Sequence, residues 1–229
     1  MILSTSGLIS SGKDTIADYL INNYGFQQFS FANSLKEVCC SIFGWEPDMI
    51  SGKTPESRLE REKVDQWWAT RLGIPEFSPR WALQHFGTDV CRKHFHDDIW
   101  IASLENKLMK TDASNIIITD ARFPNELEMI QQLNGKCIYV ERGSKPTWFD
   151  YAKRYNNSSN PVKASMRSVS MIVKEPNVFN QNIHPSEWEW IGFPFDYEIT
   201  NNGTISELYL KVNSIFLDLV RNQAANHLD

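Results

Sequence analysis

The sequence lacks the marks of a secreted or membrane-spanning protein. Its four cysteines, Cys39, Cys40, Cys91 and Cys137, do not form a disulfide framework, and a chain of 229 residues needs none for stability. No basic segment followed by an apolar stretch marks a signal peptide, and no run approaches the ~18 apolar residues of a membrane span. We therefore expect a protein of a reducing, cytoplasmic compartment that makes no membrane contact.

Positive charge is also scarce. The chain has 23 Lys and Arg against 28 Asp and Glu, a net charge of −5, which disfavours a binder of duplex nucleic acid. An acidic protein that binds anions must do so locally, with backbone N–H groups and a few clustered cations. Residues 142–174 form such a cluster, with seven Lys or Arg and a single Asp. This stretch is either a solvated basic loop or a mobile lid that closes over a polyphosphate.

Hydrophobic periodicity predicts an α/β protein in which strands and helices alternate. The expected strands cover residues 2–5, 29–31, 116–120, 137–140 and 197–200. The expected helices cover residues 14–24, 34–43, 56–71, a stretch from 79 that is interrupted at 87–89, 124–133 and 204–219. This order predicts a mostly parallel central sheet with helices on both faces. We expect a single domain over 1–229, with an insertion at 46–79 and a lid-like segment at 143–190.

A glycine-rich loop follows the first expected strand. Gly7 to Thr15 read G-x-x-x-x-G-K-D-T, and the next helix begins at the same place. Glycines let backbone N–H groups converge on phosphate oxygens, the helix N-terminus favours anions, and Lys13 adds a full positive charge. The strand before the loop and the helix after it favour a phosphate site over a simple helix-capping turn. The residues expected in this site are Ser10, Ser11, Gly12, Lys13, Asp14 and Thr15.

The hydroxyl residue of this loop is displaced by one position. Asp14 directly follows Lys13 and Thr15 comes next, whereas the common motif places its magnesium-binding hydroxyl beside the lysine. We therefore expect Mg²⁺ to be held largely through water, with Thr15 as one oxygen donor. The chain also lacks the N-K-x-D motif that reads guanine, which argues against a GTPase switch.

A second polar group follows the most apolar strand. Asp120 ends the run that begins at Ile116, and Arg122 and Glu126 come next, on either side of Pro124. The carboxyl ends of parallel strands face the ligand crevice of an α/β sheet. Asp120 is therefore expected to order magnesium-bound water, as the second metal-site donor, or to receive a substrate group. The alternative is a structural ion pair between Asp120 and Arg122 that caps the helix at Pro124.

A polar stripe runs along the helix expected from residue 79. Its members are Arg80, Gln84 and Thr88, and Gly87 interrupts the helix where a chain would approach a ligand. Arg suits a phosphate and Gln suits the edge of a base, although a solvated helix face is the usual origin of such a stripe. Trp100 suits either a contact with a sugar or base or a place in the core.

These residues together resemble the deoxynucleoside monophosphate kinases of tailed phages, within the P-loop kinase group, over nearly the whole chain. The resemblance rests on Gly7 to Thr15, Phe31 to Lys36, Arg80 with Leu83-Gln84 and Gly87-Thr88-Asp89, Trp100, Thr119 to Arg122 with Glu126, Arg142, and Asn202-Gly203. It implies a three-layer P-loop kinase fold with a helical substrate-binding insertion and a lid. It also implies the host cytoplasm as the compartment if a phage encodes the chain.

The resemblance further implies a role for each of these residues. The phosphates of ATP would bind around Lys13 and Thr15, and its adenine would lie near Asn202 and Gly203. The catalytic cations would be Lys13, Arg122 and Arg142. A deoxynucleoside 5′-monophosphate would be held by Lys36, Arg80, Thr88, Trp100, Asp120, Arg122 and Glu126, to which the polar stripe adds Gln84 and Gly87.

The expected activity is transfer of the γ-phosphoryl group of ATP, with Mg²⁺, to a deoxynucleoside 5′-monophosphate, giving ADP and the diphosphate for DNA synthesis. The acceptor is already an anion, so positioning and charge neutralisation replace a general base. Two alternatives stay open, a P-loop kinase of another small metabolite and a nucleotide-binding regulatory module without turnover. The expected partners are deoxynucleoside monophosphates, with a homodimer left open.

Overall fold

The computed structural model describes residues 1–163, 166, 177–179 and 181–225. It divides the chain into two compact units. Unit 1 comprises Met1–Phe29 and Asp112–Asp229, and unit 2 comprises Ser30–Thr111, so unit 2 is inserted into the sequence of unit 1. The functional division expected from the sequence, a single domain with an insertion at 46–79 and a lid at 143–190, stays a prediction.

Unit 1 is built on a five-stranded sheet. Its strands are β1 (Ile2–Ser6), β2 (Gln27–Phe29), β3 (Ile116–Ile118), β4 (Lys136–Glu141) and β5 (Tyr197–Thr200). They lie in the order β2-β3-β1-β4-β5 and every neighbouring pair is parallel, which confirms the α/β class and the parallel sheet. In the central strand β1, Leu3 is in register with Ile117 on one side and Lys136 on the other. All carboxyl ends therefore meet at one edge of the sheet.

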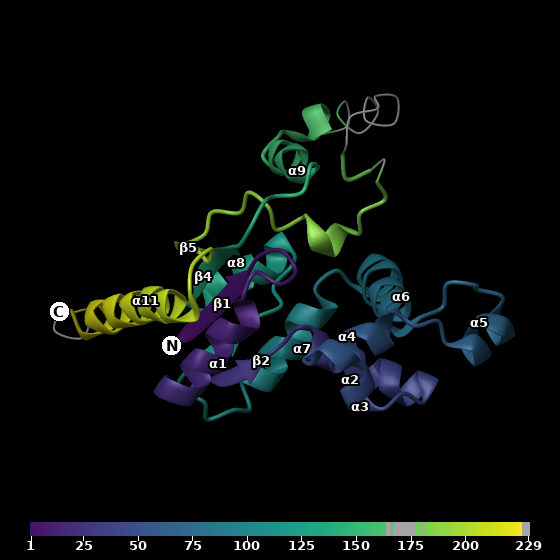
Figure 1. Cartoon of the computed structure of the whole chain (residues 1–229), viewed down its shortest axis with the longest axis horizontal. Helices are drawn as coiled ribbons and strands as arrows, with labels where there is room; N and C mark the ends of the chain where they lie inside the picture. The colour runs from purple at the N-terminus through teal and green to yellow at the C-terminus, as the bar shows by residue number, and fades with distance from the viewer. Residues whose placement is uncertain (164–165, 167–176, 180, 226–229) are drawn as a thin grey trace. The chain divides into compact units, whose positions relative to one another are not determined.

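Helices cover both faces of this sheet (Figure 1). Their bounds are Lys13–Tyr24 (α1), Pro124–Gln132 (α8) and Ile205–Ala225 (α11). α1 and α11 enclose a buried aliphatic core with one face of the sheet, to which Ile138 of β4 contributes. The preceding residue, Cys137, places its thiol against the Leu127 carbonyl of α8. Because successive side chains of a strand point to opposite faces, α8 covers the other face of the sheet. The sheet thus lies between two helical layers, as the sequence predicted.

Unit 2 is helical. Its helices are α2 (Ala32–Phe43), α3 (Pro47–Ser51), α4 (Pro55–Glu62), α5 (Gln66–Leu72), α6 (Pro79–Gln84), the π-helix η1 (His85–Phe95) and α7 (Ile99–Leu108). An aromatic cluster joins these short helices, because the Phe43 ring lies 4.7 Å from Trp45, 5.2 Å from Trp68 and 5.3 Å from Phe77, measured between centroids. Large aromatic rings bury enough area to stabilise a unit whose helices are too short to be stable alone.

Three of the expected elements differ in the structure. The helix expected over 56–71 is two helices, because Asp65 accepts a hydrogen bond from the Trp68 N–H and caps α5 (3.2 Å). The strand expected over 29–31 ends at Phe29, since Phe31 is the buried N-cap residue of α2. The prediction that the helix is interrupted at 87–89 is wrong, because the π-helix η1 continues through these residues.

The described residues of the segment 143–190 are held by contacts with nearby parts of the chain. It contains α9 (Phe149–Asn156) and the short 3₁₀ turn η2 (Pro185–Glu187). The Asn156 amide N–H groups donate to the carbonyls of Trp188, Glu189 and Ile191, at 3.0, 3.2 and 2.8 Å. These bonds fix the end of α9 to the chain that follows η2.

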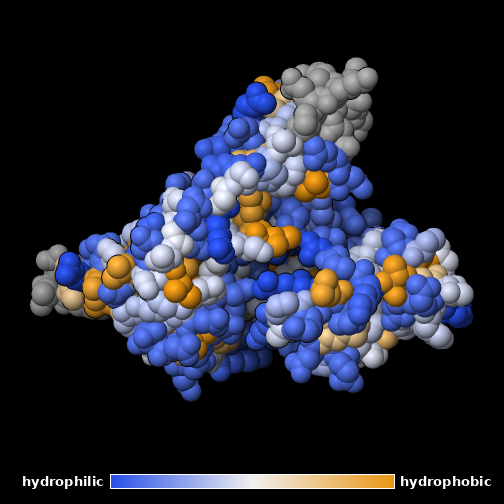
Figure 2. All heavy atoms as spheres, viewed as in Figure 1, coloured by the Kyte–Doolittle hydropathy of each residue, from blue (hydrophilic) through white to orange (hydrophobic). Residues whose placement is uncertain are grey.

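The visible face of the molecule is mostly hydrophilic, with apolar residues set among the polar ones (Figure 2). Within the residues covered by the structure, no helix is long and apolar enough to cross a membrane.

Candidate functional site

The loop after β1 is shaped by its two glycines. Gly7 and Gly12 adopt φ angles of +156° and +107°, and Ser10 lies at +63°, in the left-handed region that other residues seldom occupy. A Cβ on Gly7 would lie 2.3 Å from the Val140 carbonyl oxygen, and one on Gly12 would lie 2.4 Å from the Asn201 amide nitrogen. The loop is thus pressed against the ends of β4 and β5, and α1 begins directly after it at Lys13.

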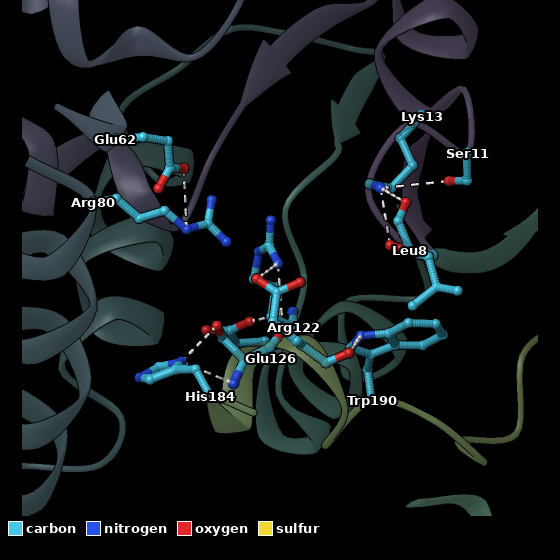
Figure 3. Close-up of polar contacts among 12 residues, drawn as sticks. Leu8, Ser11, Lys13, Glu62, Arg80, Arg122, Glu126, His184 and Trp190 are labelled. Carbon is cyan, nitrogen blue, oxygen red and sulfur yellow. Dashed lines mark hydrogen bonds and ion pairs between the residues drawn. The ribbon is translucent and has the colours of Figure 1, made fainter. Parts of the chain in front are cut away.

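Lys13 folds back over this loop (Figure 3). Its ammonium donates to the carbonyls of Gly7 (2.9 Å) and Leu8 (2.8 Å) and to the Ser11 hydroxyl (3.4 Å). Ser11 is buried, whereas Ser10 and Asp14 are exposed and Thr15 is half-buried in the first turn of α1. Of the predicted loop residues, the structure thus brings Ser11 to the Lys13 ammonium at the start of α1, and a helix N-terminus favours anions.

Asn201 completes the loop and was not predicted as a site residue. Its buried side chain donates to the Ser11 carbonyl at 2.9 Å, and its backbone N–H donates to the Glu141 carbonyl at 2.7 Å. It therefore ties the loop to the carboxyl edge of β4 and β5. Its position directly after the last expected strand was the one hint in the sequence that Asn201 could belong to the site. Its partner, Ser11, lies 190 residues earlier in the chain, so no local pattern indicates this contact.

We expect Asn201→Ala to lower the free energy of unfolding by about 1–3 kcal/mol, because the Ser11 carbonyl would lose its buried partner. Asn23→Ala is the matched control, since the Asn23 amide makes a similar bond to the Tyr19 carbonyl (2.8 Å) at an exposed position. Chemical denaturation of both variants measures the difference. Equal destabilisation would contradict the role given to Asn201.

The residues after β3 lie beside the loop. The Ser6 hydroxyl, at the end of β1, donates to the Ala121 carbonyl at 3.0 Å and holds the segment that carries Asp120 and Arg122. Glu126 is 3% exposed, and its carboxylate accepts the Arg122 N–H (2.7 Å) and the Phe123 N–H (3.2 Å). Through these contacts Glu126 caps the start of α8 and shapes the backbone around Arg122.

The ends of β4 and β5 bring three further predicted residues to this edge. Arg142 is exposed directly after β4, and the Asn202 side chain accepts the Gly143 N–H at 2.7 Å. Gly203 follows, and Glu207 caps α11 by accepting the Thr204 N–H at 2.7 Å, while the Thr204 hydroxyl accepts the Glu207 N–H. This backbone hydrogen bond holds the pKa of Glu207 below its ordinary value.

The predicted magnesium donors, Thr15 and Asp120, are both residues of unit 1 at the carboxyl edge of the sheet. Side-chain oxygens are the donors that Mg²⁺ prefers, and it commonly retains several waters, so this pair fits the ion. Among residues that the structure describes, no group of three or more His, Cys, Asp or Glu could hold a metal. Burial raises the pKa of the Cys39 thiol to about 12, which makes it an inert structural thiol.

The remaining predicted residues lie in unit 2. The Lys36 ammonium donates to the Ser51 carbonyl at 3.0 Å, and Arg80 lies 3.5 Å from a Glu62 carboxylate oxygen (Figure 3). Gln84 is the last residue of α6 and is half-buried, like Thr88. Arg80 and Gln84 share α6, whereas Thr88 follows in η1.

Gly87 and Trp100 pack inside unit 2. The Trp100 indole donates to the Gly87 carbonyl at 3.0 Å, and Trp100 is 9% exposed. A Cβ on Gly87 would lie 2.6 Å from a Leu35 methyl group, so Gly87 serves close packing. The predicted stripe thus begins on α6 with Arg80 and Gln84, and only Thr88 lies in the π-helix η1, a rare element that is often found at functional sites.

The basic stretch 142–174 is described in part. Lys145 pairs with Glu141 at 3.1 Å and lies over the Phe149 ring at 5.0 Å, and Lys163 lies over the Tyr155 ring at 5.7 Å. Arg167 and Lys174 lie outside the described residues. Whether this stretch is a lid or a solvated loop stays a prediction.

Comparison with known proteins gives two curated relatives. A protein of Acanthamoeba polyphaga mimivirus, provisionally named a deoxynucleotide monophosphate kinase, is 27% identical over 93% of this chain and 95% of its own length. The deoxynucleoside-5′-monophosphate kinase of Escherichia phage T5 is 28% identical over 58% of this chain and 73% of its own length. Among solved structures, shikimate kinase from Aquifex aeolicus matches with 12% identity over 98% of this chain and 99% of its own, at a TM-score of 0.42.

A family model adds a third comparison. Residues 56–151 match the model of the deoxynucleotide monophosphate kinases. This range includes the predicted substrate residues from Arg80 to Glu126 and also Arg142, while the loop around Lys13 lies before it. The chain is thus similar, along most of its length, to a named deoxynucleotide monophosphate kinase, and in residues 56–151 to the family that its motifs resemble.

Proposed function

We propose that this protein transfers the γ-phosphoryl group of ATP to a deoxynucleoside 5′-monophosphate and releases ADP and the deoxynucleoside diphosphate. The observation that carries the proposal is the Lys13 ammonium over a glycine loop at the start of α1, in a chain related to kinases of this name. Neither a regulatory module nor a kinase of another metabolite is needed to explain that combination.

The loop supplies the donor site. Backbone N–H groups and the helix N-terminus provide fixed partial charges, and the Lys13 ammonium exchanges its carbonyl partners for phosphate oxygens. Asn201 keeps the loop in place while this exchange occurs. Asn202 and Gly203, after β5, are proposed to contact the adenine.

Thr15 and Asp120 are the proposed holders of Mg²⁺, mainly through water. Bound there, the ion would neutralise charge on the β- and γ-phosphates. The other site residues position the reactants, since an anionic acceptor needs no general base. Arg122 and Arg142 are proposed to offset the negative charge of the acceptor and of the transferred group. Lys36, Arg80, Gln84 and Thr88 of unit 2 are proposed to bind the acceptor.

A panel of acceptors tests this function. We expect ADP release in a coupled assay with ATP, Mg²⁺ and at least one of the common deoxynucleoside monophosphates, and no comparable release with shikimate, gluconate or dephospho-coenzyme A. ATP binding without acceptor-dependent ADP release would contradict the proposal and favour a regulatory module. Release only with a non-nucleotide acceptor would favour a different kinase.

A further inference from the structure

Arg122 makes a side-chain contact that the sequence did not indicate. Its Nη1 group lies 3.2 Å from the Glu187 carboxylate and donates to the Ser186 carbonyl at 3.4 Å (Figure 3). The Arg122 side chain is 37% exposed and that of Glu187 is 16% exposed, so this pair is shielded on the carboxylate side and open on the guanidinium side. Pairs of this kind are stronger than fully exposed ones.

Glu187 lies on a turn that is itself held firmly. His184 is the N-cap residue of the turn η2, and its ring nitrogen accepts a hydrogen bond from the Ser186 N–H at 3.3 Å. The Trp190 indole donates to the Glu187 carbonyl at 3.1 Å, and the buried Trp190 ring lies 5.7 Å from the Tyr139 ring of β4, measured between centroids. The backbone of Glu187 is thus anchored to the central sheet through Trp190.

Arg122 is therefore fixed at both ends. Glu126 accepts its backbone N–H at 2.7 Å, and Glu187 accepts from one nitrogen of its guanidinium. Within the described part of the chain, the Nε and Nη2 groups of Arg122 make no hydrogen bond. A guanidinium is a planar fork, so holding one nitrogen sets the direction of the others.

We propose that Glu187 is a positioning residue that orients Arg122 toward the phosphate of the acceptor. The inference rests on the proposed function, because it needs an anionic acceptor at Arg122. Orientation before binding lowers the entropy lost when the acceptor is held, which favours acceptor binding and leaves ATP binding unaffected. The carboxylate does not touch the substrate.

The first test is steady-state kinetics of Glu187→Ala with the best acceptor of the panel. We expect the acceptor KM to rise about tenfold or more, the loss expected for a hydrogen bond to a charged group, while the KM of ATP changes by less than about twofold. Glu187→Gln keeps an oxygen acceptor at the same place and should restore most of the affinity. Glu128→Ala, at an exposed position on α8, is the matched control and should leave both constants unchanged.

A double-mutant cycle tests whether Glu187 acts through Arg122. In an Arg122→Ala background, Glu187→Ala should change the acceptor KM by less than about twofold, because the group that it orients is gone. Additive effects would overturn the inference. So would an unchanged acceptor KM in folded Glu187→Ala, or a lower one, which would show that the carboxylate competes with the acceptor's phosphate.

The outcomes separate this inference from the proposed function. A wild-type protein without acceptor-dependent ADP release overturns both, whereas an active wild type with an unaltered Glu187→Ala overturns the inference alone. If Glu187→Ala does not fold, Glu187→Asp gives the same test, since its carboxylate is one methylene shorter and cannot keep the 3.2 Å contact without movement. An unchanged acceptor KM in Glu187→Asp then overturns the inference.

Discussion

Replacing Lys13 with Ala is expected to lower the turnover number by on the order of 10²-fold or more, the usual loss for a donor that stabilises transition-state charge. The Lys13 ammonium is already held over the phosphate loop by the Gly7 and Leu8 carbonyls, so it is placed to follow the transferred group. ADP release under saturating ATP and acceptor measures the loss. Gly7 and Leu8 are half-buried, so we expect only a modest change in stability.

Lys110→Ala is the control for this substitution. Lys110 is exposed just after α7. Its replacement removes the same charge without touching the loop, so the turnover number of this variant should equal that of the wild type. A folded Lys13→Ala protein with wild-type turnover would remove Lys13 from the catalytic residues. Loss of ATP affinity with an unchanged turnover number would assign Lys13 to ATP binding alone. A substitution that changes KM but not kcat removes an interaction that stabilises the ground state and the transition state equally.

Gly7→Ala is expected to have the largest effect on the loop as a whole. The added Cβ would lie 2.3 Å from the Val140 carbonyl oxygen, and the φ angle of +156° is closed to alanine, so the loop must leave the edge of β4. A displacement of about 1 Å is enough to reduce catalysis on the order of 10²-fold. We expect kcat/KM for ATP to fall by at least that factor, measured by initial rates at low ATP.

Gly25→Ala separates contact from backbone strain. Gly25 also has a positive φ, +66°, but an added Cβ would meet nothing within 4 Å. This variant should lose only the roughly 1–2 kcal/mol that alanine costs in the left-handed region, with unchanged kinetics. If Gly7→Ala matched Gly25→Ala in both stability and kcat/KM, the close approach of the loop to Val140 would not matter for ATP use.

Much of the fold could be predicted from local patterns. The β-branched run from Ile116 and the glycine motif at 7–15 each combine composition with a characteristic spacing, and both lie where they were expected, although the strand expected over 116–120 ends at Ile118. The π-helix η1 could not be predicted, because its wider turn depends on backbone hydrogen bonds rather than on a side-chain pattern. Gly87 therefore looked like a break in a helix, although it packs against Leu35.

Sequence is enough to propose a site residue that acts through its own chemistry. Lys13 and Arg122 follow β1 and β3 in the chain and carry the charge that a phosphate requires, so sequence alone made them candidates. Asn201 and Glu187 act on partners 190 and 65 residues away, so only the folded chain reveals them. The substrate role expected for Glu126 stays a prediction, and the structure adds that its carboxylate accepts backbone N–H groups at the start of α8.

The strand order also governs when the phosphate loop can form during synthesis. β1 is synthesised first, but both strands that pair with it, β3 and β4, come after residue 115 in the chain. All of unit 2 is made in the interval, and its contacts are closed within 82 residues, Ser30–Thr111. Unit 2 can therefore fold while β1 still waits for partners, since local contacts form faster than distant ones. The nascent chain acquires its nucleotide site late, when Val140 and Asn201 have left the ribosome.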